Sequence, residues 1–162
     1  MSRRGHVHPR RGFAAVGIYH PKHGVNVGSL WRAASLYGAA MIFTVGRRYD
    51  PQASDTPGTI RRVPLLHFAD VDDLIAHLPL SCPLVGVEMA PAAVPLERFA
   101  HPERAAYLLG AEDHGLPQRV IDRCHRLVQI ESPSDESMNV ACAGSIVLWH
   151  RHNQASALSK TA

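Results

Sequence analysis

The sequence has only three cysteines and no long apolar run, and each scarcity excludes a class of protein. Cys82, Cys124 and Cys142 lie far apart and form no Cys-x-x-Cys pair, so neither a disulfide framework nor a redox motif is indicated. No apolar run approaches the roughly 20 residues that span a bilayer, and no signal-peptide core follows the basic N-terminus. We therefore expect a cytoplasmic protein with free thiols and without a membrane segment.

Several common ligand-binding motifs are also missing. The chain contains neither the Gly-x-Gly-x-x-Gly pattern of dinucleotide-binding folds nor the phosphate-binding P-loop pattern. Among the paired histidines only His20 and His23 have a helical spacing, and a proline lies between them; loop histidines are more often surface residues than zinc ligands. No serine occupies a Gly-x-Ser-x-Gly elbow, although sequence order alone leaves a serine triad open. We expect no metal.

The remaining composition is that of a globular domain. The 162 residues are 46% hydrophobic, which is enough for one domain with a core. The net charge of +3 allows an anionic partner without establishing one. We expect one domain over 13–154, a basic flexible tail over 1–12 and a second flexible tail over 155–162. The arginines of the first tail suit a solubilising arm and phosphate contacts equally well.

Short apolar runs alternate with helical patterns along this domain. The runs predict strands over 13–19, 41–46, 63–68, 83–89, 105–110 and 126–130. The patterns predict a helix over 26–38 closed by Gly38, a helix capped by Asp70, a short helix around 117–124 and a final helix over 138–154. A long polar loop spans 47–62, and a proline-broken connection with a short helix spans 91–103. This alternation indicates an α/β fold with a mostly parallel sheet flanked by helices, whose ligands bind at the carboxyl ends of the strands.

Three motifs lie at the edges of predicted strands. They are Asn-x-Gly-x-x-x-Arg-x-Ala at 26–34, Leu-Leu-Gly-Ala-Glu-Asp-His-Gly-Leu-Pro at 108–117, and residues 130–149, where a strand and a polar loop lead through Ser-Met-Asn at 137–139 into an apolar helix. Singly, each has an ordinary explanation: Asn26 and Ser137 as helix caps, Gly110 and Gly115 as turn glycines. In this order and spacing they resemble the signature motifs of the SpoU/TrmH family, a branch of the SPOUT superfamily of RNA methyltransferases. The resemblance covers residues 13 to 152.

The resemblance implies a C-terminal deep trefoil knot over roughly residues 85–145, a homodimer whose active site uses both subunits, and S-adenosylmethionine as cofactor. The family's cofactor contacts correspond to Val87, Glu88, Met89, Leu109, Gly110, Ile130, Ser137 and Met138. Gly115 and Leu116 offer a position without a side chain and an apolar wall. The sequence departs from the family where an acidic loop, rather than a proline, follows Ile130, and where Met138 replaces a frequent leucine.

The reaction that the resemblance implies is methyl transfer to a ribose 2′-hydroxyl of tRNA or rRNA. It assigns Arg32 to the substrate site, and the helix over 26–38 would carry this arginine to the mouth of the cofactor crevice. An arginine stays protonated in almost any protein, with a pKa above about 12, so we favour a phosphate clamp over a general base and leave the choice open. Asn26 and Glu112 would hold the geometry of the site, and Ser137 with Asn139 would fix the cofactor loop.

The basic residues near the predicted site extend this interpretation to RNA binding. We expect RNA contacts from Arg32, Arg47, Arg48, Arg61, Arg62 and Arg151. Two alternatives remain: a non-catalytic RNA-binding protein that keeps the fold, and a small-molecule methyltransferase that uses the same crevice. The complete motif residues argue against the first, and the arginines around the loop over 47–62 weigh weakly against the second.

Overall fold

The computed structural model describes residues 12–52, 58, 62–134 and 136–160. Apart from Gly12, the basic tail predicted over 1–12 lies outside these residues, and so does Arg61.

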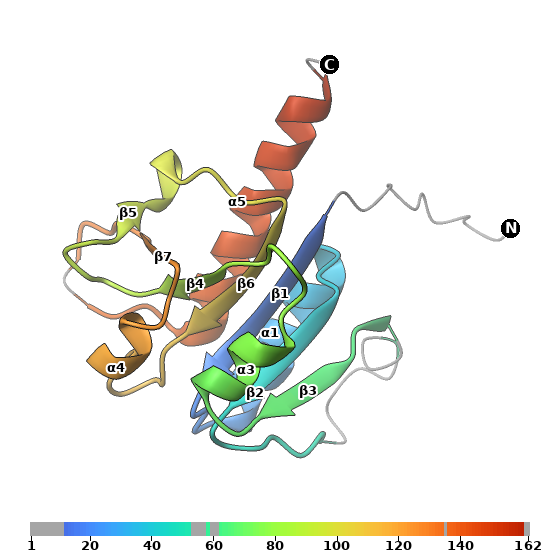
Figure 1. Ribbon diagram of the computed structural model, residues 1–162, viewed down its shortest axis with the longest axis vertical. Helices are drawn as coiled ribbons and strands as arrows, with labels where there is room; N and C mark the ends of the chain where they lie inside the picture. The colour runs from blue at the N-terminus through green and yellow to red at the C-terminus, as the bar shows by residue number, and fades with distance from the viewer. Residues whose placement is uncertain (1–11, 53–57, 59–61, 135, 161–162) are drawn as a thin grey trace, which may run out of the picture.

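The described strands form a seven-stranded sheet in which every pairing is parallel (Figure 1). They are β1 (Phe13–Tyr19), β2 (Met41–Val45), β3 (Leu65–Phe68), β4 (Leu84–Val87), β5 (Val94–Pro95), β6 (Arg104–Leu109) and β7 (Arg126–Gln129), in the order β3-β2-β1-β6-β4-β7-β5. Six of them confirm the predicted strands. The seventh, β5, has two residues and lies in the connection over 91–103, where a proline-broken sequence gave no strand pattern.

The helices cover both faces of the sheet (Figure 1). They are α1 (Gly24–Leu36), α3 (Val71–His77), α4 (Gln118–Ile121) and α5 (Val140–Lys160), with a short 3-10 helix η1 (Leu96–Arg98). As predicted, the Asp70 side chain caps α3, accepting from the Asp73 N–H at 2.9 Å. Helix α5 extends to Lys160, into the tail predicted over 155–162, because the residues after Asn153 include no glycine or proline to end it. The flexibility of this tail stays a prediction.

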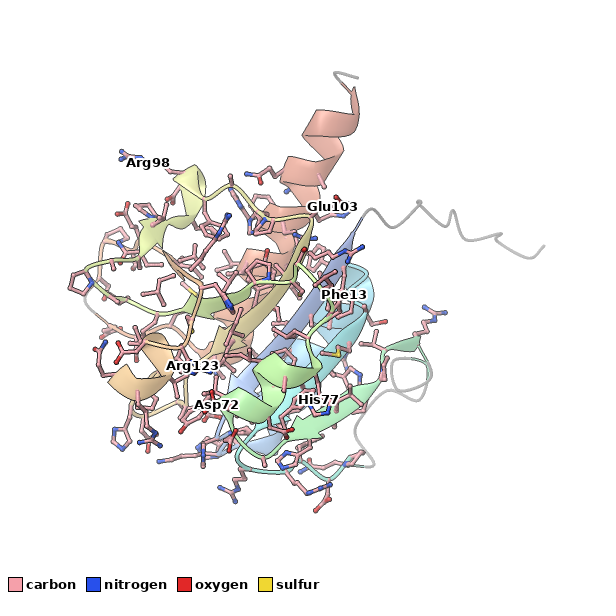
Figure 2. The ribbon with its side chains drawn as sticks, in the orientation of Figure 1. Phe13, Asp72, His77, Arg98, Glu103 and Arg123 are labelled. Atoms are coloured by element: carbon pink, nitrogen blue, oxygen red, sulfur yellow. The ribbon has the colours of Figure 1, made fainter. Side chains whose placement is uncertain are left out.

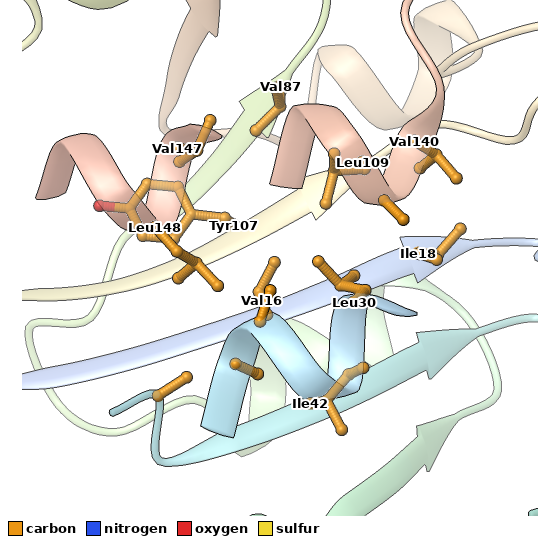
Figure 3. Packing of buried hydrophobic residues seen from close by; sticks show 14 of the residues in the cluster. Val16, Ile18, Leu30, Ile42, Val87, Tyr107, Leu109, Val140, Val147 and Leu148 are labelled. Atoms are coloured by element: carbon orange, nitrogen blue, oxygen red, sulfur yellow. The ribbon is translucent and has the colours of Figure 1, made fainter. Parts of the chain in front are cut away.

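The sheet separates two apolar clusters, and β1 contributes to both. Val16 and Ile18 pack with Leu30 of α1 and Val147 of α5 on one face, as Figure 3 shows. Ala15 and Tyr19 pack with the residues of α3 and α4 on the other face. A strand with helices on both sides is apolar along its whole length, which explains why the run over 13–19 shows no alternation with polar residues.

None of the helices in the described part of the chain is long and apolar enough to cross a membrane. Among the same residues no group of three or more His, Cys, Asp or Glu side chains could hold a metal ion. Cys82, Cys124 and Cys142 are free thiols. The cytoplasmic location stays a prediction.

A half-buried polar cluster joins the amino end of β6 to α5. Nδ1 of His101 lies 2.6 Å from the hydroxyl of Tyr107, and Nε2 of His101 lies 2.9 Å from Nδ1 of His150. Burial, followed by the nearby charges of His150 and Arg151, lowers the pKa of His101 from 6.5 to about 3. In the unfolded chain His101 takes up a proton as the pH falls through 6.5. In the folded protein it therefore stays neutral until the pH approaches about 3.

This cluster predicts acid sensitivity. The pKa of His101 is lower in the folded protein than in the unfolded chain, so unfolding takes up a proton between pH 6.5 and about 3. The contribution of neutral His101 to the free energy of unfolding is therefore complete above pH 6.5 and is lost as the pH falls through this range. His101→Gln should flatten the decline of the urea midpoint on the acid side of pH 6.5. His77→Gln, at an exposed histidine, is the control. Equal pH slopes for wild type and His101→Gln would contradict the assignment.

Candidate functional site

A pocket of about 520 Å³ opens where β4, β6 and β7 end. Loops that follow neighbouring parallel strands meet at this edge, which is where ligands of such sheets bind. Nine of the ten predicted cofactor-binding residues line the pocket: Val87, Glu88, Met89, Leu109, Gly110, Gly115, Ile130, Ser137 and Met138. Leu116 does not line it, because its side chain is 5% exposed and packs into the apolar cluster beside α4. Its expected role as a pocket wall is therefore corrected.

The pocket also has lining residues that the motifs did not nominate as cofactor contacts. They are Ala111, Glu112, Asp113, His114, Ser132, Ser134, Glu136, Val140 and Ala143, of which Glu112 was expected only to hold the geometry of the site. All of them lie within or directly after the second and third motifs. Their nearness in sequence to the nominated residues was the signal that could have found them.

Three side chains, one from each motif, form a chain of hydrogen bonds beside the pocket. Nδ2 of Asn26 donates to Oε1 of Glu112 at 2.9 Å, and Nδ2 of Asn139 donates to Oδ1 of Asn26 at 3.0 Å. Asn26 is 7% exposed, so an amide left without its partners there would keep the cost of its desolvation. This network, Asn26–Glu112–Asn139, fixes the first turn of α1, the loop after β6 and the start of α5 relative to one another.

Glu112 is an ionised acceptor in this network. It also accepts hydrogen bonds from the backbone N–H groups of Lys22 at 3.1 Å and His23 at 3.2 Å. Burial by itself raises the pKa of this carboxyl, but the hydrogen bonds from Asn26 and from backbone N–H groups outweigh burial and hold the pKa below its usual 4.5. An ion pair between Lys22 and Asp113 joins the same two loops. The geometry supports the positioning role predicted for Glu112.

Asn139, rather than Ser137, caps the N-terminus of α5. Oδ1 of Asn139 accepts from the N–H groups of Ala141 at 2.9 Å and Cys142 at 3.2 Å, which is the arrangement of an N-cap. Ser137 is exposed and lines the pocket. The simple explanation of Ser137 as a helix cap is therefore wrong.

Asn26 is not a cap either. Helix α1 begins at Gly24, two residues before the predicted start, and His23 at its N-cap position makes no side-chain capping bond. Asn26 lies in the first turn of the helix, where its side chain is used by the network instead. Gly38 follows the helix with a φ of 71°, in agreement with the predicted helix end.

The second motif folds back on itself as a tight loop. Ala111 and Gly115 exchange two backbone hydrogen bonds of 3.2 and 3.0 Å. Gly115 has a φ of 61°, and a Cβ there would lie 2.3 Å from the carboxylate of Glu88. A Cβ on Gly110 would lie 2.2 Å from the carbonyl carbon of Gly115. Both glycines are required by the close approach of this loop to its neighbours, in addition to their place in the pocket wall.

Arg32 lies on the exposed face of α1 and does not line the pocket of its own chain. The opposite face of the helix, including Leu30 and Ala34, is buried as the pattern predicted. Exposed with Arg32 are Val25 and Leu36, whose exposed fractions are 70% and 74%. The expectation that α1 brings Arg32 to the mouth of the crevice is therefore not met within one chain.

The other arginines expected to bind RNA fall into two groups. Arg47, Arg48 and Arg62 are exposed, the first two directly after β2 at the carboxyl edge of the sheet. Arg151 is half-buried in α5, where its guanidinium donates to the backbone carbonyls of Pro102 and Glu103 at the amino end of β6. Arg151 therefore holds α5 to the sheet, at the edge opposite the pocket, and is withdrawn from the predicted RNA contacts.

Solved structures with the same fold include known RNA-modifying enzymes. An AdoMet-bound rRNA methyltransferase from Sinorhizobium meliloti is 24% identical, over 91% of this chain and 59% of that chain, with a TM-score of 0.79. The A. aeolicus TrmH/SpoU tRNA modifying enzyme is 16% identical over 93% and 79%, with a TM-score of 0.82. A structure concerning the 2-OH methylation of C/U34 on tRNA is 21% identical over 91% and 99%, with a TM-score of 0.75. The chain spans about three fifths of the length of the Sinorhizobium meliloti relative.

The fold is thus shared with proteins described as RNA methyltransferases. Residues 14–149 also match the model of the SpoU rRNA Methylase family. Because the match covers most of the sequence, this chain belongs to the SpoU rRNA methylase family. No curated protein sequence gives a significant match.

The hydrogen-bond network makes a prediction about stability. Asn26→Ala removes a donor to Glu112 and the acceptor of Asn139, so we expect a loss of about 1–3 kcal/mol in the free energy of unfolding. Urea unfolding measures this loss. Ser29→Ala, at an exposed position of the same helix, is the matched control for helix propensity. If the two variants unfold at the same urea concentration, the network contributes nothing to stability.

Proposed function

We propose that the protein transfers the methyl group of S-adenosylmethionine to a ribose 2′-hydroxyl of tRNA or rRNA. The observation that carries this proposal is that the second and third family motifs line one pocket, while the Asn26–Glu112–Asn139 network connects the first motif to them. The relative from Sinorhizobium meliloti that binds AdoMet, and the structure concerning 2-OH methylation on tRNA, support the cofactor and the reaction.

The pocket fits S-adenosylmethionine in size and chemistry. Its volume of about 520 Å³ lies within the range of about 300–1,000 Å³ that small-molecule sites occupy. Val87, Leu109 and Ile130 provide apolar walls for an adenine ring, and the backbone at the strand ends offers hydrogen-bonding groups for its edge. When bound, the cofactor supplies a methyl group activated by a positively charged sulfur. The residues that hold it are those of the second and third motifs.

Arg32 binds an RNA phosphate and thereby orients the ribose. A guanidinium offers two parallel N–H donors to a phosphate and remains protonated at neutral pH, which suits a clamp and argues against a general base. Correct placement of a reacting hydroxyl lowers the barrier by several kcal/mol. The hydroxyl proton then passes to a phosphate oxygen rather than to the guanidinium.

A second copy of the chain completes the site. Arg32 lies between exposed Val25 and Leu36 on α1, and the half-exposed Trp149 lies on the neighbouring α5. Apolar side chains on adjacent exposed helices form a surface that favours association. In a homodimer built on this face, Arg32 of one subunit serves the pocket of the other. We include the trefoil knot over roughly residues 85–145 in the same proposal, on the basis of the family resemblance.

Subunit complementation tests the role of Arg32. Arg32→Ala should bind S-adenosylmethionine as the wild type does but lose methyl transfer to RNA, and Met138→Arg should block the pocket. When the two inactive chains are refolded together, half of the dimers are mixed and each has one intact site, so about a quarter of the wild-type activity returns. Calorimetry and radiolabel transfer to total tRNA and to rRNA are the measurements.

If Arg32 serves its own chain, mixed dimers have no intact site and no activity returns. If calorimetry detects no S-adenosylmethionine on the wild-type protein, the non-catalytic alternative replaces the proposed function. Arg32→Lys, which keeps the charge but not the fork of donors, should recover only part of the activity.

The arginines after β2 make a separate prediction. Arg48→Glu should weaken RNA binding and reduce the slope of log affinity against log salt by about 0.7–0.9, the contribution of one phosphate contact. Arg98→Glu is the control: Arg98 is exposed on η1 (Figure 2), directly after β5, which is the edge strand at the opposite end of the sheet from β3 and β2. Filter binding over a range of salt concentrations measures both. Equal slopes for the two variants would remove Arg48 from the RNA surface.

A further inference from the structure

The pocket wall is acidic. Among the described lining residues there are four carboxylates, Glu88, Glu112, Asp113 and Glu136, and no lysine or arginine. Asp113 is neutralised by its ion pair with Lys22. The N-terminus of α5 contributes a partial positive charge of about half a unit, and two of its N–H groups are already bonded to Asn139. The wall therefore retains a net negative charge.

Two of these carboxylates are fixed in place. Glu88 accepts from the backbone N–H of Leu116 at 2.6 Å and from that of Met89 at 3.0 Å. Gly115 lies so close to Glu88 that it leaves no room even for a methyl group between them. Glu112 is held by Asn26 and by backbone N–H groups. Neither carboxylate can turn away from the pocket without breaking hydrogen bonds, so their charge is a permanent property of the wall.

We propose that this wall selects the cationic methyl donor over the uncharged demethylated product, with Glu88 as a specificity-determining residue. The inference rests on the proposed function. In the transfer, the ribose oxygen forms a bond to the methyl carbon, the sulfur keeps the electron pair of the broken bond, and the hydroxyl proton leaves. The sulfonium thus becomes a neutral thioether, and the bound molecule loses one positive charge while its shape barely changes.

Fixed anions discriminate between two such ligands by charge alone. In a site partly shielded from water, nearby carboxylates attract a sulfonium and leave a thioether almost unaffected. Binding therefore becomes weaker when the methyl group departs, and fresh donor replaces the product. A glutamine in place of Glu88 removes the charge and keeps only one of the two acceptors for the backbone N–H groups of Leu116 and Met89. Loss of this support weakens all ligands alike, so the discrimination is read from the ratio of the affinities for the cationic and uncharged ligands.

Isothermal calorimetry at pH 8 on the full chain tests the proposal with three ligands. These are S-adenosylmethionine, S-adenosylhomocysteine and sinefungin, whose protonated amine takes the place of the methylsulfonium. We expect both cationic ligands to bind about tenfold more tightly than S-adenosylhomocysteine. Glu88→Gln should reduce this ratio by about threefold or more, because the affinity for the cationic ligands falls by more than the affinity for the neutral product. Glu97→Gln, at an exposed acid on η1, is the matched control and should preserve the ratio.

The proposal is overturned if the wild type binds S-adenosylhomocysteine as tightly as the cationic ligands. It is also overturned if Glu88→Gln weakens all three ligands equally, because Glu88 would then only support the loop. Either result leaves the proposed function standing, since all three ligands still bind. Absence of binding by every ligand would overturn the proposed function together with this inference.

Discussion

The side-chain amide of Asn26 is the contact on which the site depends. Its nitrogen donates to Glu112, 86 residues further along the chain, and its oxygen accepts from Asn139, 113 residues further along. An amide is suited to this position because it is both donor and acceptor, whereas a carboxylate would repel Glu112 and a hydroxyl would not reach both partners. A single buried side chain therefore sets the distance between α1, the loop after β6 and the start of α5.

The parallel sheet places this contact beside the pocket, at the edge where the strands end. Each strand pairs in parallel with its neighbours, so every strand ends at the same edge, and β4, β6 and β7 deliver their following loops to one place. The acidic residues Glu88 and Glu112 come from two of these loops, the first after β4 and the second after β6. Backbone N–H donors hold both carboxylates in place in the pocket wall. The electrostatic character of the site is thus a result of main-chain geometry as much as of side-chain choice.

The sequence predicted most of the strands and the buried face of α1, because strands and helices buried in this way leave a clear apolar pattern. It predicted the residues around the pocket because they belong to motifs. It failed where a residue's position depends on distant partners. Arg151 reads as a surface cation, but the carbonyls of Pro102 and Glu103 bind it at the other edge of the sheet. Arg32 is exposed on α1 as the apolar pattern implies, but where this exposed face lies relative to the pocket depends on the packing of α1 against distant strands.

The order of the strands has a consequence for folding during synthesis on the ribosome. β1 pairs with β2 along one edge. The strand that pairs with its other edge is β6, which begins only at Arg104. While the ribosome makes the first half of the chain, a fully apolar strand keeps an open edge that other chains can pair with. Parallel pairings between such distant segments also form slowly. The nascent chain therefore passes through an aggregation-prone interval, and the pocket at the ends of β4, β6 and β7, built from late segments, exists only after that interval has closed.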